Sequence, residues 1–256
     1  MRCQRPEAAH QLRVPAEVSY TLEICANSVQ SAQAAQAGGA GRIELCQNLE
    51  QGGITPSYGL IRRVRALLSI QVFVLIRPRP GNFVYDNEEF ALMQTDVLAC
   101  RELGCDGVVL GILNEAGRVD MARCRTLIAL AGSMQVTFHR AFDVCQDQAQ
   151  ALEEVIQLGC TRILTSGGAT SAEAGQQQLA ALVAQAAGRI SIQPGAGINA
   201  ENLLPVAAAT GATEFHTSAK KLISLPSQPN QFDVTHWQTD AGLVRELVEL
   251  LAEGSD

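Results

Sequence analysis

The chain has 256 residues, of which 47% are hydrophobic, and a formal net charge of −7. This charge argues against a nucleic-acid-binding protein, because phosphate binding requires clustered Lys and Arg side chains. No apolar run approaches the ~20 residues of a membrane-spanning helix, and none has the flanks of a secretory signal. We therefore expect a cytoplasmic protein that binds neither nucleic acid nor membranes.

Short apolar or β-branched runs recur along the chain and predict parallel strands. Ala- and Leu-rich stretches with helical spacing follow the first seven of them. Residues 72–76 are continuously apolar, which is typical of a strand covered by helices on both faces. Eight such units in about 250 residues predict an α/β fold, a single-domain (β/α)8 or TIM barrel. The predicted strands begin near Ser19, Arg42, Gln71, Asp106, Met134, Thr161, Arg189 and Thr213.

Capping residues indicate where several of the helices begin. Asn27 and Ser28 precede a predicted helix that ends near Gln36, and residues 55–57 open the next. Residues 86–87 precede a longer helix that ends near Leu103. A further helix is expected to open at residues 200–201.

The two ends of the chain differ from the repeating body. Residues 1–17 have no periodicity, and we expect a poorly ordered extension there. The barrel domain is expected to span residues 18–256. Within it, residues 220–237 contain prolines and serines and precede a C-terminal helix at residues 239–251, with Asp240 at its start. That helix would close the outer ring behind the eighth strand.

Titratable side chains stand at or just after the ends of the predicted strands. Active sites of (β/α)8 barrels lie at the C-terminal ends of the strands, so these residues are catalytic candidates. Asp143 has an alternative role as a helix cap or as a partner of an Arg side chain. The catalytic candidates are Glu44, Arg77, His139, Arg140 and Asp143.

Two neighbouring strands share a Glu-x-Cys pattern. By strand alternation, Glu23 and Cys25 face the barrel interior, and so do Glu44 and Cys46. Adjacent strands lie ~4.8 Å apart, so the two thiols can meet near the mouth and form a soft site suited to Cu(I). The alternative is that two small thiols only fill a layer of the core.

The two carboxylates lie one layer deeper, where they would repel each other without compensating charges. We expect Arg77, His139 and Arg140 to compensate them. Several charged groups gathered on one face of a barrel favour a binding or catalytic site over a purely structural ion network.

Glycines later in the chain suggest an anion site. Barrels often hold phosphate in the loops after strands seven and eight, where backbone N–H groups can approach the anion. Ordinary turn geometry is the alternative explanation for these glycines. His216, on the eighth strand, is either a ligand-facing group or a core histidine. The anion-binding candidates are Gly167, Gly168, Gly195, Gly197 and Ser218, together with Glu23, Arg79 and His216.

Several motifs in order resemble the CutC family. They are residues 23–25, 42–46, 52–57, 76–79, 137–143, 164–168 and 214–216, and the similarity runs from about Tyr20 to Ala219. The resemblance implies a cytosolic (β/α)8 barrel connected with copper homeostasis. It also implies that Cys25 and Cys46 are Cu(I) ligands.

Two functions remain open at this stage. In the first, the protein binds Cu(I) through Cys25 and Cys46. In the second, it is an enzyme that acts on a small anionic or phosphorylated metabolite and has no direct role with copper. Three arginines would then clamp the anion, a histidine would be the general acid or base, and Glu44 or Glu23 would be its partner. These are Arg77, Arg79, Arg140 and His139. Either function is compatible with a homo-oligomer.

Overall fold

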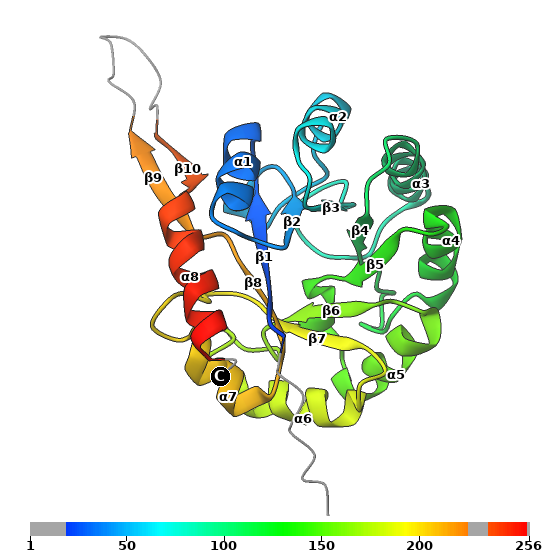
Figure 1. Cartoon of the computed structure of the whole chain (residues 1–256). Coiled ribbons are helices and arrows are strands. Elements are labelled where there is room, and N and C mark those ends of the chain that lie inside the picture. Colours follow the sequence, from blue (N-terminus) through cyan, green and yellow to red (C-terminus); the bar gives the residue numbers. More distant parts are fainter. Residues whose placement is uncertain (1–18, 225–234, 255–256) are drawn as a thin grey trace, which may run out of the picture.

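A parallel eight-stranded sheet closes around a central axis, and helices surround it (Figure 1). The computed structural model describes residues 19–224 and 235–254, so the predicted extension at residues 1–17 lies outside it. Each strand begins within two residues of its predicted position, and the predicted (β/α)8 barrel is confirmed. The strands are β1 (Thr21–Ala26), β2 (Arg42–Leu45), β3 (Gln71–Leu75), β4 (Gly107–Leu110), β5 (Gln135–Phe138), β6 (Arg162–Thr165), β7 (Ser191–Pro194) and β8 (Glu214–Thr217).

The hydrogen-bonded order of the strands runs from β7 through β6, β5, β4, β3, β2 and β1 to β8. β7 and β8 pack against each other and complete the circle. At this seam Gly195 is closely packed, because a Cβ there would lie 2.5 Å from Leu164 Cδ1 and 3.4 Å from His216 Cβ. A larger residue where the two edge strands meet would require the Leu164 side chain to move.

Four helices begin at the positions that their capping residues predict. Ser28, Ser57, Asp86 and Asp240 each accept a hydrogen bond from the backbone N–H three residues later. The helix after β7 begins two to three residues later than predicted. The helices are α1 (Val29–Ala37), α2 (Tyr58–Leu67), α3 (Asn87–Glu102), α4 (Met121–Ala131), α5 (Gln148–Leu158), α6 (Gln176–Ala186), α7 (Leu203–Thr210) and α8 (Ala241–Glu253), with short 3-10 turns η1 (Leu49–Gln51) and η2 (Arg140–Val144).

A two-stranded antiparallel hairpin follows β8 and projects beyond the barrel (Figure 1). It consists of β9 (Lys220–Ser224) and β10 (Thr235–Thr239). This hairpin was not predicted, because the prolines of this segment indicate a loop. Lys220 lies over the ring of Trp237, with its Nζ 4.5 Å from the ring centroid.

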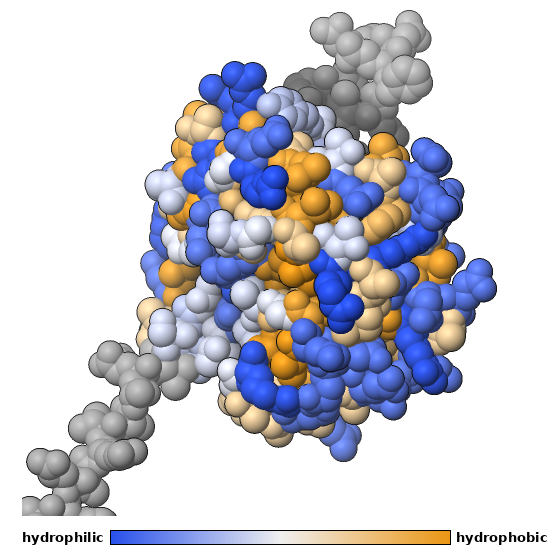
Figure 2. Space-filling view, turned by 90° about the vertical axis from the view of Figure 1, so that its right-hand side faces the viewer, coloured by the Kyte–Doolittle hydropathy of each residue, from blue (hydrophilic) through white to orange (hydrophobic). Residues whose placement is uncertain are grey.

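The outer helices bury one face against the sheet and expose the other. Figure 2 shows one side of the molecule, where hydrophilic residues form most of the surface and hydrophobic ones lie among them. None of the helices in the described part of the chain combines the length and hydropathy that crossing a bilayer requires.

The barrel interior is separate from the core under the helices, as strand alternation predicts. Ile24 and Ile43 pack in the outer core between sheet and helices. Cys25, Cys46 and Phe73 belong to a second apolar cluster inside the barrel. The Glu-x-Cys side chains of β1 and β2 therefore face inward.

The lower part of the barrel interior contains a network of buried charges. Arg42 forms ion pairs with Glu23 and with Glu214, the latter at 2.7 Å. Arg162 contacts the same Glu214 at 2.8 Å. Both guanidinium groups also lie over the ring of Phe73, each 5.2 Å from its centroid. Each arginine thus has carboxylate and aromatic partners that compensate for the loss of water.

We predict that Arg42→Met destabilises the fold by about 3 kcal/mol or more, because it removes a guanidinium partner from two buried carboxylates, Glu23 and Glu214. The pKa values of Glu23 and Glu214 lie below their ordinary values: burial opposes ionisation, but the arginines outweigh it. Their pairing therefore stabilises the fold above an unfolded-state pKa of ~4.3 and is lost as the pH falls through the folded values. The difference between variant and wild type should be largest near neutral pH and shrink in acid.

Urea unfolding of both proteins at several pH values measures this effect. The matched control is Arg189→Met, since Arg189 pairs with Glu153 on the surface, where both side chains are about half exposed. That change should have a much smaller effect. Equal losses in the two variants would contradict the assignment of the buried network.

Candidate functional site

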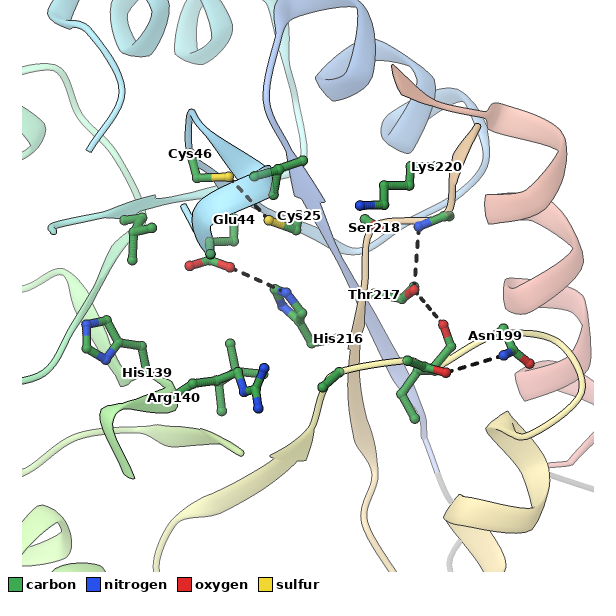
Figure 3. Close-up of a pocket in the computed structure, with 18 of the residues that line it drawn as sticks. Cys25, Glu44, Cys46, His139, Arg140, Asn199, His216, Thr217, Ser218 and Lys220 are labelled. Atoms are coloured by element: carbon green, nitrogen blue, oxygen red, sulfur yellow. Dashed lines mark hydrogen bonds and ion pairs between the residues drawn. The ribbon is translucent and has the colours of Figure 1, made fainter. Parts of the chain in front are cut away.

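A cavity of about 730 Å³ opens at the C-terminal ends of the barrel strands. Its floor is formed by inward-facing side chains of β1, β2 and β8, and its walls by the loops after several strands and by α8. Figure 3 shows the floor, with two thiols, a carboxyl group and an imidazole close together. Among the predicted candidates, the cavity is lined by Cys25, Glu44, Cys46, Arg77, His139, Arg140, Asp143, Gly197, His216 and Ser218.

The two predicted thiols meet on the cavity floor. The Sγ atoms of Cys25 and Cys46 lie 3.3 Å apart, and both residues are buried. The β1–β2 ladder brings them together, since the Cys46 N–H donates to the Ala26 carbonyl. The hydrogen bond with Cys46 and burial raise the pKa of the Cys25 thiol well above its ordinary value. All seven cysteines in the described residues are free thiols, and Cys3 lies outside them.

His216 lies between two carboxyl groups. Its Nδ1 is 2.7 Å from Glu23 Oε1, and its Nε2 is 3.5 Å from Glu44 Oε2. Burial disfavours the imidazolium, but the hydrogen bonds with Cys25 and Glu23 and the charge of Glu44 hold the His216 pKa well above its ordinary value. His216 lines the cavity, and both of its ring nitrogens face carboxyl groups.

The two glutamates differ in their ionisation. Burial and the nearby charge of Glu23 raise the pKa of Glu44 to about 7, although His216 opposes this rise. Arg42 and His216 keep the pKa of Glu23 low in spite of its burial. Glu44 therefore titrates in the range of a general acid or base, whereas Glu23 stays charged.

We expected Arg77, His139 and Arg140 to compensate these carboxylates, and this expectation is wrong. Arg42 and His216 perform that role. Arg42 was not among the predicted candidates, because it stands at the start of β2 and those candidates stand at strand ends. Its position, two residues before Glu44, places it on the same inward face of the strand.

Arg77 and Arg79 hold loops together. Arg77 donates to the carbonyls of Gln51 and Gly53, at 3.2 and 2.7 Å, and to that of Gly81 at 2.9 Å. It thereby joins the loop after β2 to the loop after β3. Arg79 pairs with Glu89 of α3 and donates to backbone carbonyls of its own loop. These contacts occupy both Nη groups of Arg77 and all three nitrogens of Arg79.

His139 lies in the cavity wall as a neutral imidazole. Burial and the charge of Arg77 lower its pKa to about 3. Its Nδ1 accepts a hydrogen bond from the Ala141 N–H at 3.2 Å and thereby caps η2. The ring also packs near Phe83, with centroids 5.0 Å apart. This environment favours a structural role over that of a cationic acid.

Asp143 occupies the glycine loop that follows β6. Its carboxylate accepts hydrogen bonds from the N–H groups of Ser166 and Gly168, at 3.0 and 3.2 Å, and from the Thr165 hydroxyl at 2.5 Å. It also pairs with Arg140 Nε at 2.7 Å. The loop predicted to bind an external anion therefore binds a carboxylate of its own chain, and Asp143 is the Arg partner of our alternative interpretation.

Arg140 retains exposed guanidinium surface at the cavity. Asp143 binds its Nε, and its Nη2 donates to the Ser166 hydroxyl at 3.2 Å. The side chain remains 45% exposed and extends into the cavity (Figure 3).

The glycine candidates after β7 separate into two groups. The Gly195 N–H donates to the Thr165 carbonyl at 3.0 Å and belongs to the strand ladder. Gly197, with a φ of 80° that favours glycine, lines the cavity together with Ser218. Lys220, which was not among the predicted candidates, lies at the same end of the cavity (Figure 3).

Comparison with known proteins identifies the family. A sequence model of the CutC family matches residues 20–221. A CutC family protein of Xylella fastidiosa is 54% identical over 243 residues, which cover 93% of this chain and 91% of the relative. One from Chromobacterium violaceum is 55% identical over 199 residues, which cover 78% and 81% of the two chains.

Solved structures agree with this result. A crystal structure described as the copper homeostasis protein CutC of Streptococcus agalactiae has a TM-score of 0.75 and 36% identity, and the match covers 78% of this chain and 98% of that one. A thiamine phosphate pyrophosphorylase of Pyrococcus furiosus has a TM-score of 0.59 at 16% identity and shows the fold alone. The chain belongs to the CutC family.

Proposed function

We propose that the protein binds Cu(I) through Cys25 and Cys46 as part of copper homeostasis. The observation that carries this proposal is the 3.3 Å separation of two free thiols on a cavity floor. Thiolates are the protein ligands that Cu(I) prefers. At this separation both sulfurs can bind one ion after a modest movement apart. The family and the names of its members support this function.

Cu(I) is the cargo in this proposal, and it replaces the thiol protons. Hydrogen bonding and burial favour the protonated form of Cys25, so metal binding must displace a proton from a buried group. The nearby cation His216 would compensate part of the thiolate charge. Affinity should therefore weaken as the pH falls.

We predict that the wild-type protein binds one Cu(I) per chain and that the double variant Cys25→Ser, Cys46→Ser loses this binding. Anaerobic competition against a chromogenic Cu(I) chelator measures the affinity. Cys145→Ser is the matched control, because Cys145 is partly buried and does not line the cavity. Undiminished affinity in the double variant would rule out this site.

The size of the cavity favours a second candidate function. A single ion needs far less than 730 Å³, which lies within the usual range of small-molecule sites. Arg140 and Lys220 contribute positive charge to its walls, and Ser218 contributes a hydroxyl group. These groups fit a small anionic or phosphorylated metabolite.

We predict that a ligand of this class raises the melting temperature of the wild-type protein and that Arg140→Gln reduces the rise. Differential scanning fluorimetry with inorganic phosphate and a panel of sugar phosphates tests this. Arg62→Gln, on the exposed face of α2, is the control and should respond like the wild type. A panel without any shift, or equal shifts in all three proteins, would argue against an anion site at Arg140.

A further inference from the structure

Three different donor groups converge on one point of the cavity floor. They are the thiol of Cys25 on β1, the carboxyl of Glu44 on β2 and the imidazole of His216 on β8 (Figure 3). One potential ligand atom from each lies within 4.8 Å of the other two. In a tetrahedral site with bonds of about 2.0–2.3 Å, ligand atoms lie roughly 3.5 Å apart, so small side-chain movements suffice to bind one ion.

The orientation of His216 is that of a metal ligand. Its Nδ1 contacts Glu23 Oε1 at 2.7 Å, which directs the opposite nitrogen toward Glu44. Metal-binding histidines usually hydrogen bond a carboxylate through the nitrogen that does not bind the metal, and this contact fixes the tautomer. Glu23 is itself held by Arg42, so the orienting carboxylate is fixed as well.

The chemistry of the donors distinguishes this set from the thiol pair. Two thiolates suit Cu(I), whereas one thiolate, one imidazole and one carboxylate suit a borderline divalent cation such as Zn²⁺. Within salt-bridge distance, and among residues 19–224 and 235–254, Glu44 has a single cationic neighbour, which is His216. A bound divalent cation would displace the protons of His216 and of the Cys25 thiol and would become the counter-charge of Glu44 in place of the imidazolium.

We propose that Cys25, Glu44 and His216 bind one divalent cation of the zinc class, with its fourth coordination position open to the cavity. Three protein ligands and one open position are the arrangement of catalytic rather than structural zinc sites. A cation there would polarise a carbonyl group or activate a water molecule for a molecule bound in the cavity. Cys25 is shared with the proposed Cu(I) site, so the two ions would exclude each other.

Single substitutions separate the two sites. Glu44→Gln and His216→Gln remove ligands of the divalent cation but spare both thiols, whereas Cys46→Ser breaks the thiol pair but spares the three donors. Glu246→Gln is the matched control, because Glu246 is another carboxyl group that lines the cavity. Circular dichroism of each variant establishes that it is folded.

Anaerobic equilibrium dialysis of the full chain with Zn²⁺ alone should give one ion per chain. Loss of an outer-sphere partner weakens metal sites by 10–100-fold, so we expect Glu44→Gln and His216→Gln to lose about 100-fold or more. Cys46→Ser and Glu246→Gln should retain wild-type affinity. With Co²⁺ as the probe, a thiolate-to-metal charge-transfer band should appear in the wild type and in Cys46→Ser, and be absent from Cys25→Ser.

Three results would overturn the proposal: no Zn²⁺ binding by the wild type, unchanged affinity in both Glu44→Gln and His216→Gln, or loss of Zn²⁺ binding in Cys46→Ser. Cu(I) binding, measured on the same variants, tests the thiol pair separately. Cu(I) retained by Cys46→Ser would contradict the proposed function and leave the Zn²⁺ site intact. Competition between the two ions in the wild type should be complete.

Discussion

The site depends on two arginines inside the barrel, Arg42 and Arg162. Buried carboxylates are costly without compensating charges, and these arginines provide the charges beneath the cavity. Arg42 keeps Glu23 ionised, and Glu23 in turn holds the His216 ring through its Nδ1. The orientation of His216 at the cavity floor thus depends on an ion pair one layer below it.

Two groups of residues build the site. One group holds the surrounding loops in place, and the other presents its functional groups on the cavity floor. Arg77, Arg79 and Asp143 hold the loops around the mouth and use most of their hydrogen-bonding capacity there. Cys25, Cys46, Glu44 and His216 form the floor and contact each other. The chemistry of the site is therefore concentrated in three adjacent strands, with Arg140 contributing from the opposite wall.

The sequence predicts what depends on local periodicity. Strand positions and the inward direction of Cys25 and Glu44 follow from apolar runs and from alternation along a strand, and both are confirmed. The pairing of charged side chains does not follow from local periodicity. It depends on which side chains of distant strands lie at the same level inside the barrel. Neighbouring charges at strand ends suggested Arg77 as the compensating group, whereas Arg42, earlier on the same strand as Glu44, is the arginine that pairs with Glu23 and Glu214.

Two other differences have the same origin. The glycines after β6 indicate a loop that can bind an anion, but the sequence does not reveal that Asp143 fills it. The hairpin of β9 and β10 depends on pairing between segments on either side of a proline-containing stretch, and local composition gives no measure of that pairing.

The hydrogen-bonded order of the strands has a mechanical consequence. The seam of the barrel lies between β7 and β8. In the strand order of the described residues these two strands are the ends, and they are held together by packing instead of a continuous backbone ladder. Cys25, Glu44 and His216 lie on β1, β2 and β8, which are consecutive and joined by backbone hydrogen bonds. If the barrel widened at its seam to admit a larger molecule, these three strands would move together as a rigid unit. The distances between their donor atoms would then stay unchanged.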